Sequence, residues 1–513
     1  MDLTKKNAFT VLVAIILLGA FLRFYNIGAT SFVADEFLDI NSSYAYFKTG
    51  VWQNWDFNFS RVNSDNVFEA RDSRAWIYKG QVAQVFKFLP PTESVARSVS
   101  AAWGVISIIL IYLVAKYFTR KKEIGLISAF LFAVSVSGII FDRKLRMYAM
   151  FFAVFLAFSW MLYRFLEEKY KGKNKLGVFF YQKLDINIIY LLPAIILGAV
   201  SFLTHQLTGN IVIIIFIYLL IRLIQTRKNL WPNKYLLGLS VFFAGYIVAL
   251  LLFPDKLAVF SKGIRLFENH WSYLAVTFSD YSNFILAGIF LATGIYYLAK
   301  KEKLKKETLW LAVSFFAVLF SAILIWNRNV GDQYIFFIQS FMIIIVASGI
   351  YAVCSFFKEN LSQFGRRAVY APIIIIALIL PNWGYFWTES NTYKQTSQSD
   401  NPNFRRVFTY FKKAKNSEDV LITRNFRNYY WSGAGVKVFD FGGELSTEKL
   451  KTEDIQKIQN ENHSGWFIVT DNDESYVSND AMEYAEKNFQ RVSNPEVRGK
   501  IKVYRWPASE TNL

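Results

Sequence analysis

The most evident pattern in this chain is a series of apolar runs, each close to the ~20 residues that a helix needs to cross a membrane. Charged and polar residues gather in short segments between the runs, and no repeat of fixed period is present. The runs span residues 8–25, 99–118, 123–141, 147–166, 186–204, 207–225, 236–253, 281–299, 309–326, 335–357 and 369–386. The pattern predicts a polytopic, all-α membrane bundle of about eleven transmembrane helices.

Composition agrees with this prediction. Of the 513 residues, 54% are hydrophobic and 19% are charged, a balance typical of polytopic membrane proteins. The formal net charge of +18 would raise the question of nucleic-acid binding in a soluble protein. Here most Lys and Arg residues lie beside apolar runs, where basic side chains set topology and contact anionic lipid. We therefore expect membrane lipid, and no nucleic acid, as a partner.

The basic segments predict a single topology. They follow every second apolar run, at residues 120–122, 169–175, 227–228, 300–306 and 358–367. Lys5 and Lys6 at the amino terminus fall on the same side. Because basic residues concentrate in cytoplasmic loops, the amino terminus is predicted inside and the carboxyl terminus outside. The expected location is the plasma membrane, which the chain crosses many times.

The composition becomes polar and turn-rich after residue 387. Segments with helical or strand spacing follow at 404–415, 420–423, 465–470, 481–489 and 500–506. We predict two domains, a transmembrane domain of residues 1–386 and an external soluble α/β domain of residues 387–513.

The first external loop, residues 26–98, is too long for a simple hairpin. It contains two amphipathic stretches, 36–48 and 74–88, in which aromatic residues are interleaved. Such stretches typically lie flat at the membrane interface, so interfacial helices are predicted here. Packing of the same helices on the bundle is equally compatible with the pattern.

Two adjacent carboxylates, Asp35 and Glu36, stand just after the first predicted span. A carboxylate at the mouth of a helical bundle can accept a proton from an alcohol and act as a general base. The alternative is structural, because acidic residues also stabilise the first turn of a helix. The pair could also hold a divalent cation, but further acidic ligands nearby are few, and no metal or cofactor is assigned. The single cysteine, Cys354, excludes a disulfide framework and a cysteine-based metal site.

A cluster of cations occupies a turn that the topology places outside. Arg143, Lys144 and Arg146 precede the fourth run, although short external loops are usually poor in basic residues. Taken singly, each of these cations could be an ordinary interfacial side chain that reaches the lipid headgroups. Together, and on the same side as the two carboxylates, they favour a site for a lipid-linked phosphate, which Arg binds through its planar donor fork.

Two further residues are candidates for contacts with a sugar or phosphate. Tyr148 opens the fourth run, where an interfacial aromatic residue is the simpler explanation. His205 lies in a tight turn between two runs. Its side chain either binds the donor or satisfies backbone groups of the turn.

Several segments together resemble the C-type membrane glycosyltransferases, in particular the clan of protein O-mannosyltransferases and aminoarabinose transferases. The matching segments are Leu22–Glu36, Glu93–Ser100, Asp142–Met150 and Leu203–His205. The most specific piece is Arg146-Met147-Tyr148-Ala149, which is similar to the opening of span four in that clan. The resemblance covers most of residues 8–225, and the later runs are similar only in hydropathy.

The resemblance implies a reaction and roles for the candidate residues. It implies transfer of a sugar from a dolichyl- or polyprenyl-phosphate donor to a protein, lipid or glycan acceptor on the external face, with inversion. Asp35 would be the general base, and Glu36 would orient it or the sugar. Arg146 and its basic neighbours would hold the donor phosphate and stabilise the charge that develops on it.

The sequence departs from the clan at two places. Where the clan usually has His-Pro-Pro, this chain has Arg71-Asp72-Ser73-Arg74-Ala75. Because that position commonly lies near donor or acceptor, Arg71 and Arg74 join the candidate donor-binding residues. Near the tenth run, Gln333 stands where the clan often has Arg. Both departures leave the sugar and the acceptor open.

Other functions fit parts of the pattern. An oligosaccharyltransferase or glycan polymerase that uses a lipid-linked glycan would share the fold and the acidic loop. A lipid or sugar flippase is a different class, which the lack of inverted repeats and of charges in mid-span disfavours. A non-catalytic scaffold that displays the external domain would tolerate the loss of the Asp35 carboxylate.

Overall fold

The chain forms two compact units. Unit 1 consists of Met1–Phe24, Ser100–Asp142 and Met147–Gly384, and unit 2 consists of Tyr25–Val99, Arg143–Arg146 and Tyr385–Leu513. The structure, a computed structural model, describes residues 5–63, 72–226, 233–255, 263–327, 330–361, 371–389, 391–394, 403–424, 433–441, 448–470, 473, 475–495, 497 and 500–507. The predicted first external loop thus falls in the same unit as the C-terminal residues. The predicted boundary between a transmembrane and an external domain at residue 387 stays a prediction.

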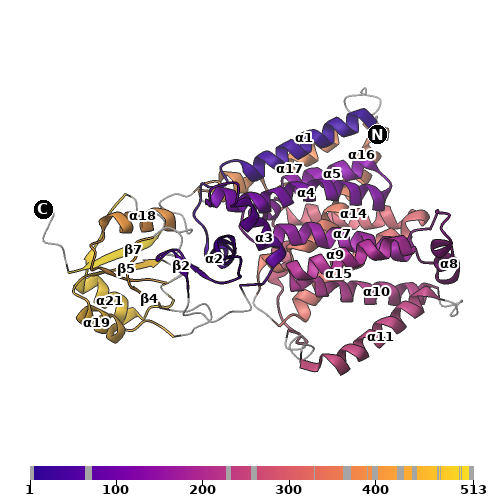
Figure 1. The fold of residues 1–513 in the computed structure, drawn as a ribbon. Helices are drawn as coiled ribbons and strands as arrows, with labels where there is room; N and C mark the ends of the chain where they lie inside the picture. Colours follow the sequence, from indigo (N-terminus) through magenta and orange to yellow (C-terminus); the bar gives the residue numbers. More distant parts are fainter. Residues whose placement is uncertain are drawn as a thin grey trace. The chain divides into compact units, whose positions relative to one another are not determined.

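Unit 1 is a bundle of helices (Figure 1). Its α-helices are α1 (Lys5–Phe24), α4 (Glu93–Thr119, which begins in unit 2), α5 (Lys122–Ala133), α6 (Val136–Asp142), α7 (Tyr148–Glu167), α8 (Lys175–Leu184), α9 (Leu191–Thr204), α10 (Asn210–Gln225), α11 (Lys234–Leu252), α13 (Ser272–Phe278), α14 (Phe284–Ala299), α15 (Lys305–Leu324), α16 (Gln339–Leu361) and α17 (Ala371–Ile379). Short 3-10 helices link them, among them η1 (Ile188–Tyr190) and η2 (Gln206–Gly209). Every predicted apolar run contains helical residues, because in lipid an isolated segment satisfies its backbone hydrogen bonds only as a helix.

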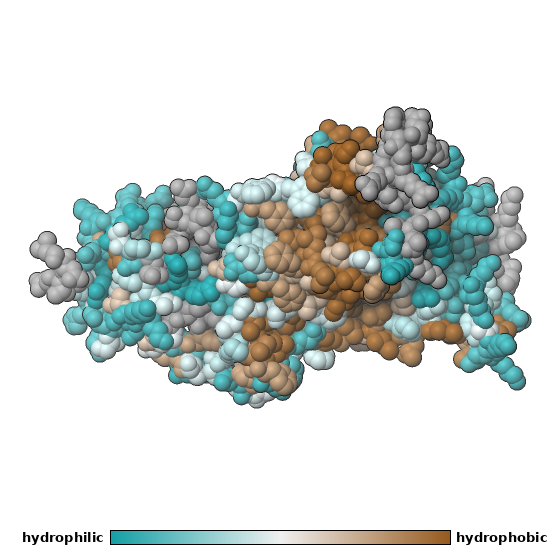
Figure 2. All heavy atoms as spheres, turned by 90° about the horizontal axis from the view of Figure 1, so that it is seen from above, coloured by the Kyte–Doolittle hydropathy of each residue, from teal (hydrophilic) through white to brown (hydrophobic). Residues whose placement is uncertain are grey.

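Seven helices in the described part of the chain are long and apolar enough to cross a membrane. Two bent pairs raise the number to nine if each pair is one span: α5 with α6 bends by 60°, and α8 with η1 and α9 bends by 107°. On the face shown in Figure 2, hydrophobic side chains form a broad surface over unit 1. The chain is a multi-pass membrane protein. The count of eleven and the inside-to-outside direction stay predictions.

Two glycines bring α14 and α16 into close contact. A Cβ atom added to Gly294 would lie 2.0 Å from the carbonyl oxygen of Ile345, and one added to Gly349 would lie 1.9 Å from that of Phe290. Only a residue without a side chain allows the two backbones to approach this closely. Small residues have the same role at many helix contacts in membranes.

A buried ion pair lies among the helices of unit 1. Arg23 Nε donates to Asp142 Oδ2 over 2.7 Å, and both side chains are inaccessible to solvent. The other guanidinium nitrogens donate to the carbonyl oxygens of Gly19, Phe132 and Ala133. The last two residues end α5, where the helix leaves carbonyl groups without partners. Arg23 therefore stabilises the break between α5 and α6.

Unit 2 contains the helices of the first loop and a C-terminal sheet. Its elements are α2 (Ala34–Thr49), β1 (Trp55–Asp56), β2 (Arg61–Val62), α3 (Trp76–Val85), α18 (Phe404–Ala414), β3 (Val420–Ile422), β4 (Val438–Phe439), α19 (Thr452–Glu461), β5 (Gly465–Thr470), α21 (Asn479–Asn488), β6 (Gln490–Arg491) and β7 (Ile501–Trp506). The amphipathic stretches at 36–48 and 74–88 form α2 and α3, which confirms them as helices. Their position at a membrane interface stays a prediction.

The C-terminal sheet has the strand order β4-β3-β5-β7-β6. β3 pairs in parallel with both neighbours, so that Leu421 lies opposite Val438 and Trp466. β7 runs antiparallel to β5, with Phe467 opposite Tyr504. The strands and helices predicted for the C-terminal residues are therefore present.

Helices cover both faces of this sheet (Figure 1). Because successive side chains of a strand point to opposite faces, Trp466 and Phe467 of β5 belong to different cores. Phe411 of α18 packs against Trp466, with ring centroids 5.6 Å apart. Phe467 shares a hydrophobic core with Ile455 of α19 and Ala481 of α21. The sheet is thus the middle of three layers.

The glycine contact between α14 and α16 gives a first prediction. We expect Gly294→Ala and Gly349→Ala each to lower the thermal midpoint of the detergent-solubilised protein, because an added methyl group forces the helices apart at a cost of about 1–3 kcal/mol. Gly288→Ala in α14 is the matched control, because no atom lies within 4 Å of its added methyl group. This variant should keep or raise the midpoint, since Ala favours a helix over Gly. Equal midpoints for all three variants, measured by size-exclusion chromatography after heating, would contradict the close packing.

Candidate active site

The two predicted carboxylates lie in the first turn of α2. Val33 precedes the helix in an extended conformation, and the Glu36 carboxylate accepts a hydrogen bond from the Val33 N–H group at 2.9 Å. This contact satisfies a backbone donor at the start of the helix. Acidic side chains at this end are also stabilised by the helix dipole. The structural alternative for the pair is thus confirmed for Glu36.

Glu36 is fully buried, and both of its carboxylate oxygens are occupied. Arg97 binds it through two parallel contacts, from Nε to Oε1 at 2.8 Å and from Nη2 to Oε2 at 2.7 Å. The Leu145 N–H group donates to Oε1 at 2.6 Å. A bidentate contact between charged groups fixes geometry as well as adding energy. Glu36 therefore connects α2 with the start of α4 and with the turn at residues 143–146.

Arg97 also holds the loop that precedes α2. Its Nη1 donates to the carbonyl oxygens of Ile27 and Thr30, at 3.1 and 2.8 Å, and its Nη2 donates to that of Ser31 at 2.9 Å. The guanidinium lies 5.0 Å from the centre of the Phe32 ring. Arg97 is only 2% exposed. The buried Arg97 side chain therefore fixes the backbone of the loop that leads into α2.

The surroundings of Glu36 keep it ionised. Burial raises the pKa of Glu36, but the Arg97 charge and the hydrogen bonds from Arg97, Leu145 and Val33 outweigh burial, so the pKa lies below its ordinary value of 4.5. Because these donors occupy its oxygens, the carboxylate is not available to a substrate proton. Glu36 is therefore part of the structure that holds α2.

Asp35 differs from its neighbour. Its side chain is exposed, and among the residues that the structure describes no donor bonds its carboxylate. Its backbone is held, because its carbonyl oxygen accepts a hydrogen bond from Arg146 Nη1 at 2.9 Å. A fixed backbone with an available carboxylate suits a general base, which must come within hydrogen-bond distance of the substrate proton.

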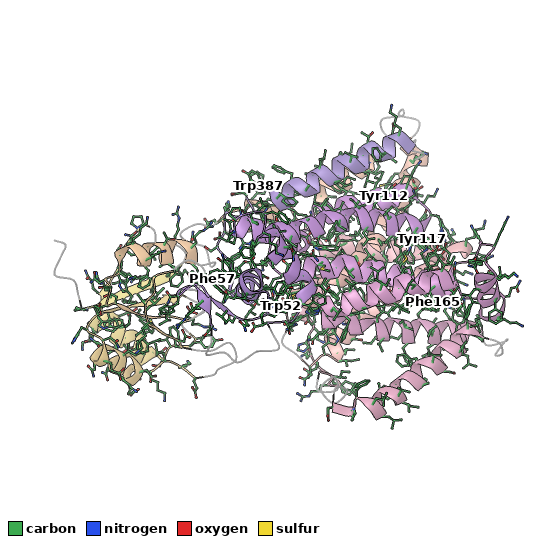
Figure 3. All side chains as sticks on the ribbon, in the orientation of Figure 1. Trp52, Phe57, Tyr112, Tyr117, Phe165 and Trp387 are labelled. Carbon is green, nitrogen blue, oxygen red and sulfur yellow. The ribbon has the colours of Figure 1, made fainter. Side chains whose placement is uncertain are left out.

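Aromatic contacts also fix α2. Trp52 stacks on Tyr46 of α2, with ring centroids 4.1 Å apart, and Phe57 packs on Tyr44 of the same helix at 4.7 Å. Figure 3 shows Trp52 and Phe57 beside this helix. These ring contacts fix α2 beyond its first turn, and Asp35 belongs to this helix.

The basic turn supplies a cationic group next to Asp35. Arg146 is nearly buried, and its Nη1 also donates to Asp39 Oδ2 at 3.0 Å. Asp39 Oδ1 in turn lies 3.5 Å from Lys79 Nζ of α3. Burial lowers the pKa of Lys79 below its ordinary value, although the Asp39 carboxylate opposes this shift. Lys79 Nζ also donates to the Asp72 carbonyl oxygen at 3.3 Å, and the Asp72 charge acts on Lys79 as well, so charges of both signs alternate here.

Arg143 and Lys144 lie in the same turn but in different surroundings. Arg143 donates to the carbonyl oxygens of Tyr25 and Thr392 and lies 4.1 Å from the centre of the Tyr393 ring. Burial lowers the pKa of Arg143 to about 10, so the side chain is still a cation at neutral pH. Arg143 thus holds the backbone at Tyr25 and Thr392, and its contact with a donor phosphate stays a prediction. Lys144 is half-buried.

Tyr148 and His205 lie together in unit 1. Both are buried, and their ring centroids are 5.4 Å apart. His205 Nδ1 accepts a hydrogen bond from the Leu207 N–H group at 3.0 Å. The His205 side chain therefore provides a hydrogen-bond acceptor for a backbone N–H group of its turn, which was one of its two predicted roles. Since Nδ1 accepts, a neutral ring carries its proton on Nε2.

Arg71 and Arg74, which precede α3 in the sequence, are the remaining residues predicted to bind the donor. Arg74 is exposed and precedes Trp76, the first residue of α3. Arg71 lies outside the residues that the structure describes.

Comparison with solved structures identifies the fold. The archaeal oligosaccharyltransferase AglB from Archaeoglobus fulgidus, in complex with an inhibitory peptide and a dolichol-phosphate, matches with a TM-score of 0.61 at 11% identity, over 96% of this chain and 73% of that chain. ArnT from Cupriavidus metallidurans bound to undecaprenyl phosphate matches with a TM-score of 0.57 at 12% identity, over 99% of each chain. This chain has the C-type glycosyltransferase fold. Comparison with family models and with curated protein sequences gave no match.

A divalent cation stays possible in this C-type fold, but two of the three acidic residues of α2 are occupied by other contacts. Glu36 has no oxygen left for a ligand bond, and Asp39 is bound by Arg146 and Lys79. Asp35 could contribute an oxygen ligand only together with waters or a donor phosphate, as Mg²⁺ sites commonly do. Among the described residues no group of three metal-binding side chains exists.

Three residues that contribute to the site in the C-type fold were not assigned from the sequence. Asp39 had a usable signal, because it follows Glu36 by three positions and residues at that spacing share a helix face. Arg97 lies in a segment that carries the resemblance, but its partner is far away in the sequence. Lys79 had no local signal at all. Their roles depend on contacts between distant segments.

The buried pair gives a prediction for pH. Because the pKa of Glu36 is held below its ordinary value, its contribution to folding stability is complete above about pH 4.5 and is lost as the pH falls through the pKa of the folded state. We expect Glu36→Gln to be less stable at neutral pH, since breaking a buried pair typically costs about 3–5 kcal/mol.

The difference in thermal midpoint between wild type and Glu36→Gln is therefore the quantity to measure. It should shrink as the pH is lowered, because only the wild type then loses the ion pair. Other carboxylates titrate in both proteins and cancel in the difference. A difference that stays constant from neutral to acid pH would contradict an ionised Glu36.

Proposed function

We propose that this chain is an integral membrane glycosyltransferase that moves a sugar from a polyprenyl-phosphate donor to an acceptor, with inversion at the anomeric carbon. The observation that carries the proposal is the contrast between two adjacent carboxylates. Glu36 is bound by Arg97, while Asp35 has an exposed side chain and a backbone carbonyl oxygen that accepts a hydrogen bond from Arg146. The C-type fold supports the proposal, because its solved neighbours are glycosyltransferases.

In the proposed reaction, Asp35 accepts the proton of an acceptor hydroxyl group. The acceptor oxygen forms a bond to the anomeric carbon on the side opposite to the phosphate. The bond between that carbon and the phosphate oxygen breaks, and the phosphate leaves with the electron pair. Attack from the opposite side inverts the configuration of the sugar. Glu36 acts indirectly, by holding α2 and therefore Asp35 in place.

Basic side chains would stabilise the leaving phosphate. Arg146 comes from the turn that bonds the backbone of Asp35, and a fixed cation aimed at developing charge lowers the barrier of such a reaction. Lys144 of the same turn would bind the phosphate equally in the donor and in the transition state. Arg143 would support them by fixing the turn. The other predicted donor contacts, which stay candidates, are Arg71, Arg74, Tyr148 and His205.

The structural neighbours support a lipid-phosphate donor. One is in complex with a dolichol-phosphate and the other is bound to undecaprenyl phosphate. We propose the same class of donor for this chain, with a protein, lipid or glycan as acceptor. We place the reaction on the external face of the plasma membrane, where the topology predicts the loop that carries Asp35. No metal is assigned to the reaction.

The likeness to an oligosaccharyltransferase favours a second candidate of the same class. In that candidate the donor is a lipid-linked glycan, and Asp35 has the same role. A flippase would instead move the lipid across the membrane without a general base. The number of phosphates on the donor distinguishes the two transferases from each other. Loss of activity without the Asp35 carboxylate distinguishes both transferases from a flippase.

Transfer assays test the proposal directly. Detergent-purified protein is incubated with candidate acceptors and a panel of polyprenyl-phosphate and polyprenyl-diphosphate sugars, and mass spectrometry follows the donor. We expect one donor to be consumed by the wild type. Asp35→Asn should be at least about a hundredfold slower, as the loss of a general base predicts, and Asp35→Glu should keep part of the activity.

The matched control is Asp480→Asn. It makes the same change at an exposed acid in the first turn of another helix, α21, and should react at the wild-type rate. Equal rates for Asp35→Asn and wild type would refute the role of Asp35. If no donor is consumed while labelled polyprenyl phosphate crosses liposome membranes, the flippase account replaces the proposal.

Lys144 gives a separate prediction about donor binding. Lys144→Gln should raise the KM for the donor by about tenfold with little change in kcat, because a charged hydrogen bond to phosphate is lost from both the ground state and the transition state. Lys87→Gln, at an exposed lysine of the same unit, should leave the KM unchanged. An unchanged KM in both variants would exclude Lys144 as a phosphate ligand.

A further inference from the structure

The short helix α8 has a surface that the proposed reaction does not use. Its axis is turned by 107° from the segment formed by η1 and α9. Because α9 is apolar and belongs to a candidate membrane span, this turn brings α8 close to the plane of the membrane. Figure 1 shows α8 across one end of the helices of unit 1.

Contacts at both ends fix α8 on unit 1. Near its start, a Cβ atom added to Gly177 would lie 2.4 Å from the Tyr170 ring, so the ring packs directly on the backbone of the helix. At its end, Lys234 of α11 lies 2.9 Å from Asp185 Oδ2 and 3.3 Å from the buried Glu167 Oε2. α8 is therefore held at its start by the segment that precedes it and at its end by α11.

The outward face of α8 combines apolar and basic side chains. Leu176 and Phe179 are 59% and 54% exposed, and their spacing of three places them on one side of the helix. Lys175 and Lys183 flank them and are exposed, whereas Gly177 is buried. Large apolar side chains between lysines are typical of helices that lie at the level of lipid headgroups, where the ammonium groups reach the phosphates.

Further charge surrounds this face. Five exposed lysines precede or belong to α8: Lys169, Lys171, Lys173, Lys175 and Lys183. Nearby acids do not neutralise them, because Glu168 is bound by Arg164 and Asp185 by Lys234. Figure 3 shows Tyr117 and Phe165 towards the same end of the bundle, and Tyr117 donates to Glu168 at 2.8 Å. The segment from Lys169 to Lys183 therefore combines five exposed lysines with two exposed apolar side chains.

We propose that α8 and these five lysines form a binding surface for anionic phospholipid. Leu176 and Phe179 insert at the boundary between headgroups and acyl chains, and the ammonium groups bind the lipid phosphates. The occupant is a lipid and not a small anion, because the two exposed apolar side chains are removed from water only by acyl chains. The topology predicts this surface on the cytoplasmic side, where anionic lipids produce a negative surface potential.

Native mass spectrometry of the full-length protein tests the proposal. The protein in detergent is titrated with phosphatidylglycerol or with phosphatidylcholine. The test variant combines Lys171→Gln, Lys173→Gln, Lys175→Gln and Lys183→Gln, and we expect it to bind phosphatidylglycerol at least about tenfold more weakly while binding of phosphatidylcholine is unchanged. The matched control combines four exposed lysines of unit 2, Lys449→Gln, Lys451→Gln, Lys457→Gln and Lys487→Gln, and should bind both lipids like wild type.

Two further variants separate the contribution of the positive charge from that of the apolar side chains. Replacing the four lysines of the test variant with arginine keeps the charge and should keep the binding, which separates charge from any effect on folding. Replacing Leu176 and Phe179 with serine keeps the charge but should weaken binding of phosphatidylglycerol. Undiminished binding in the glutamine variant, or equal binding of soluble glycerol phosphate by the wild type, would overturn the proposal. The readout is bound lipid, so the result is independent of the proposed transfer reaction.

Discussion

The candidate active site depends on the ion pair between Arg97 and Glu36. Arg97 binds both oxygens of Glu36 and three carbonyl oxygens of the loop before α2, and Glu36 also accepts the Leu145 N–H group. A buried charge is costly unless all of its partners are in place, so the loop, the helix and the basic turn are fixed together. The helix then presents Asp35 outward on a fixed backbone.

Two adjacent and chemically similar carboxylates thus acquire different roles from their surroundings. Glu36 is buried, bonded through both oxygens and kept ionised, so it contributes structure. Asp35 is exposed, and no donor among the described residues bonds its carboxylate, which agrees with the proposed role as general base. The same division applies to the basic turn, where Arg143 holds backbone carbonyl groups while Arg146 lies beside Asp35. The surroundings, and not the residue type, decide which of these side chains is buried in ion pairs and which is exposed.

Hydropathy predicted the membrane helices because lipid leaves few alternatives to a helix. It did not predict where those helices break. The bend between α5 and α6 is stabilised by Arg23, which bonds the end of α5 and also Asp142, a residue 119 positions away. The acidic pair was found from its place after the first span, but which carboxylate is buried is decided by Arg97. Such contacts between distant segments have no local pattern in the sequence.

A structure of the full chain with bound polyprenyl phosphate, determined by electron cryomicroscopy, would test the central claim most directly. The account predicts that the phosphate lies within hydrogen-bond distance of Arg146 or Lys144, that the Asp35 carboxylate faces the same space, and that Glu36 remains bound to Arg97. A phosphate held away from the turn at residues 143–146, or a Glu36 carboxylate released from Arg97 and turned towards the donor in place of Asp35, would contradict it.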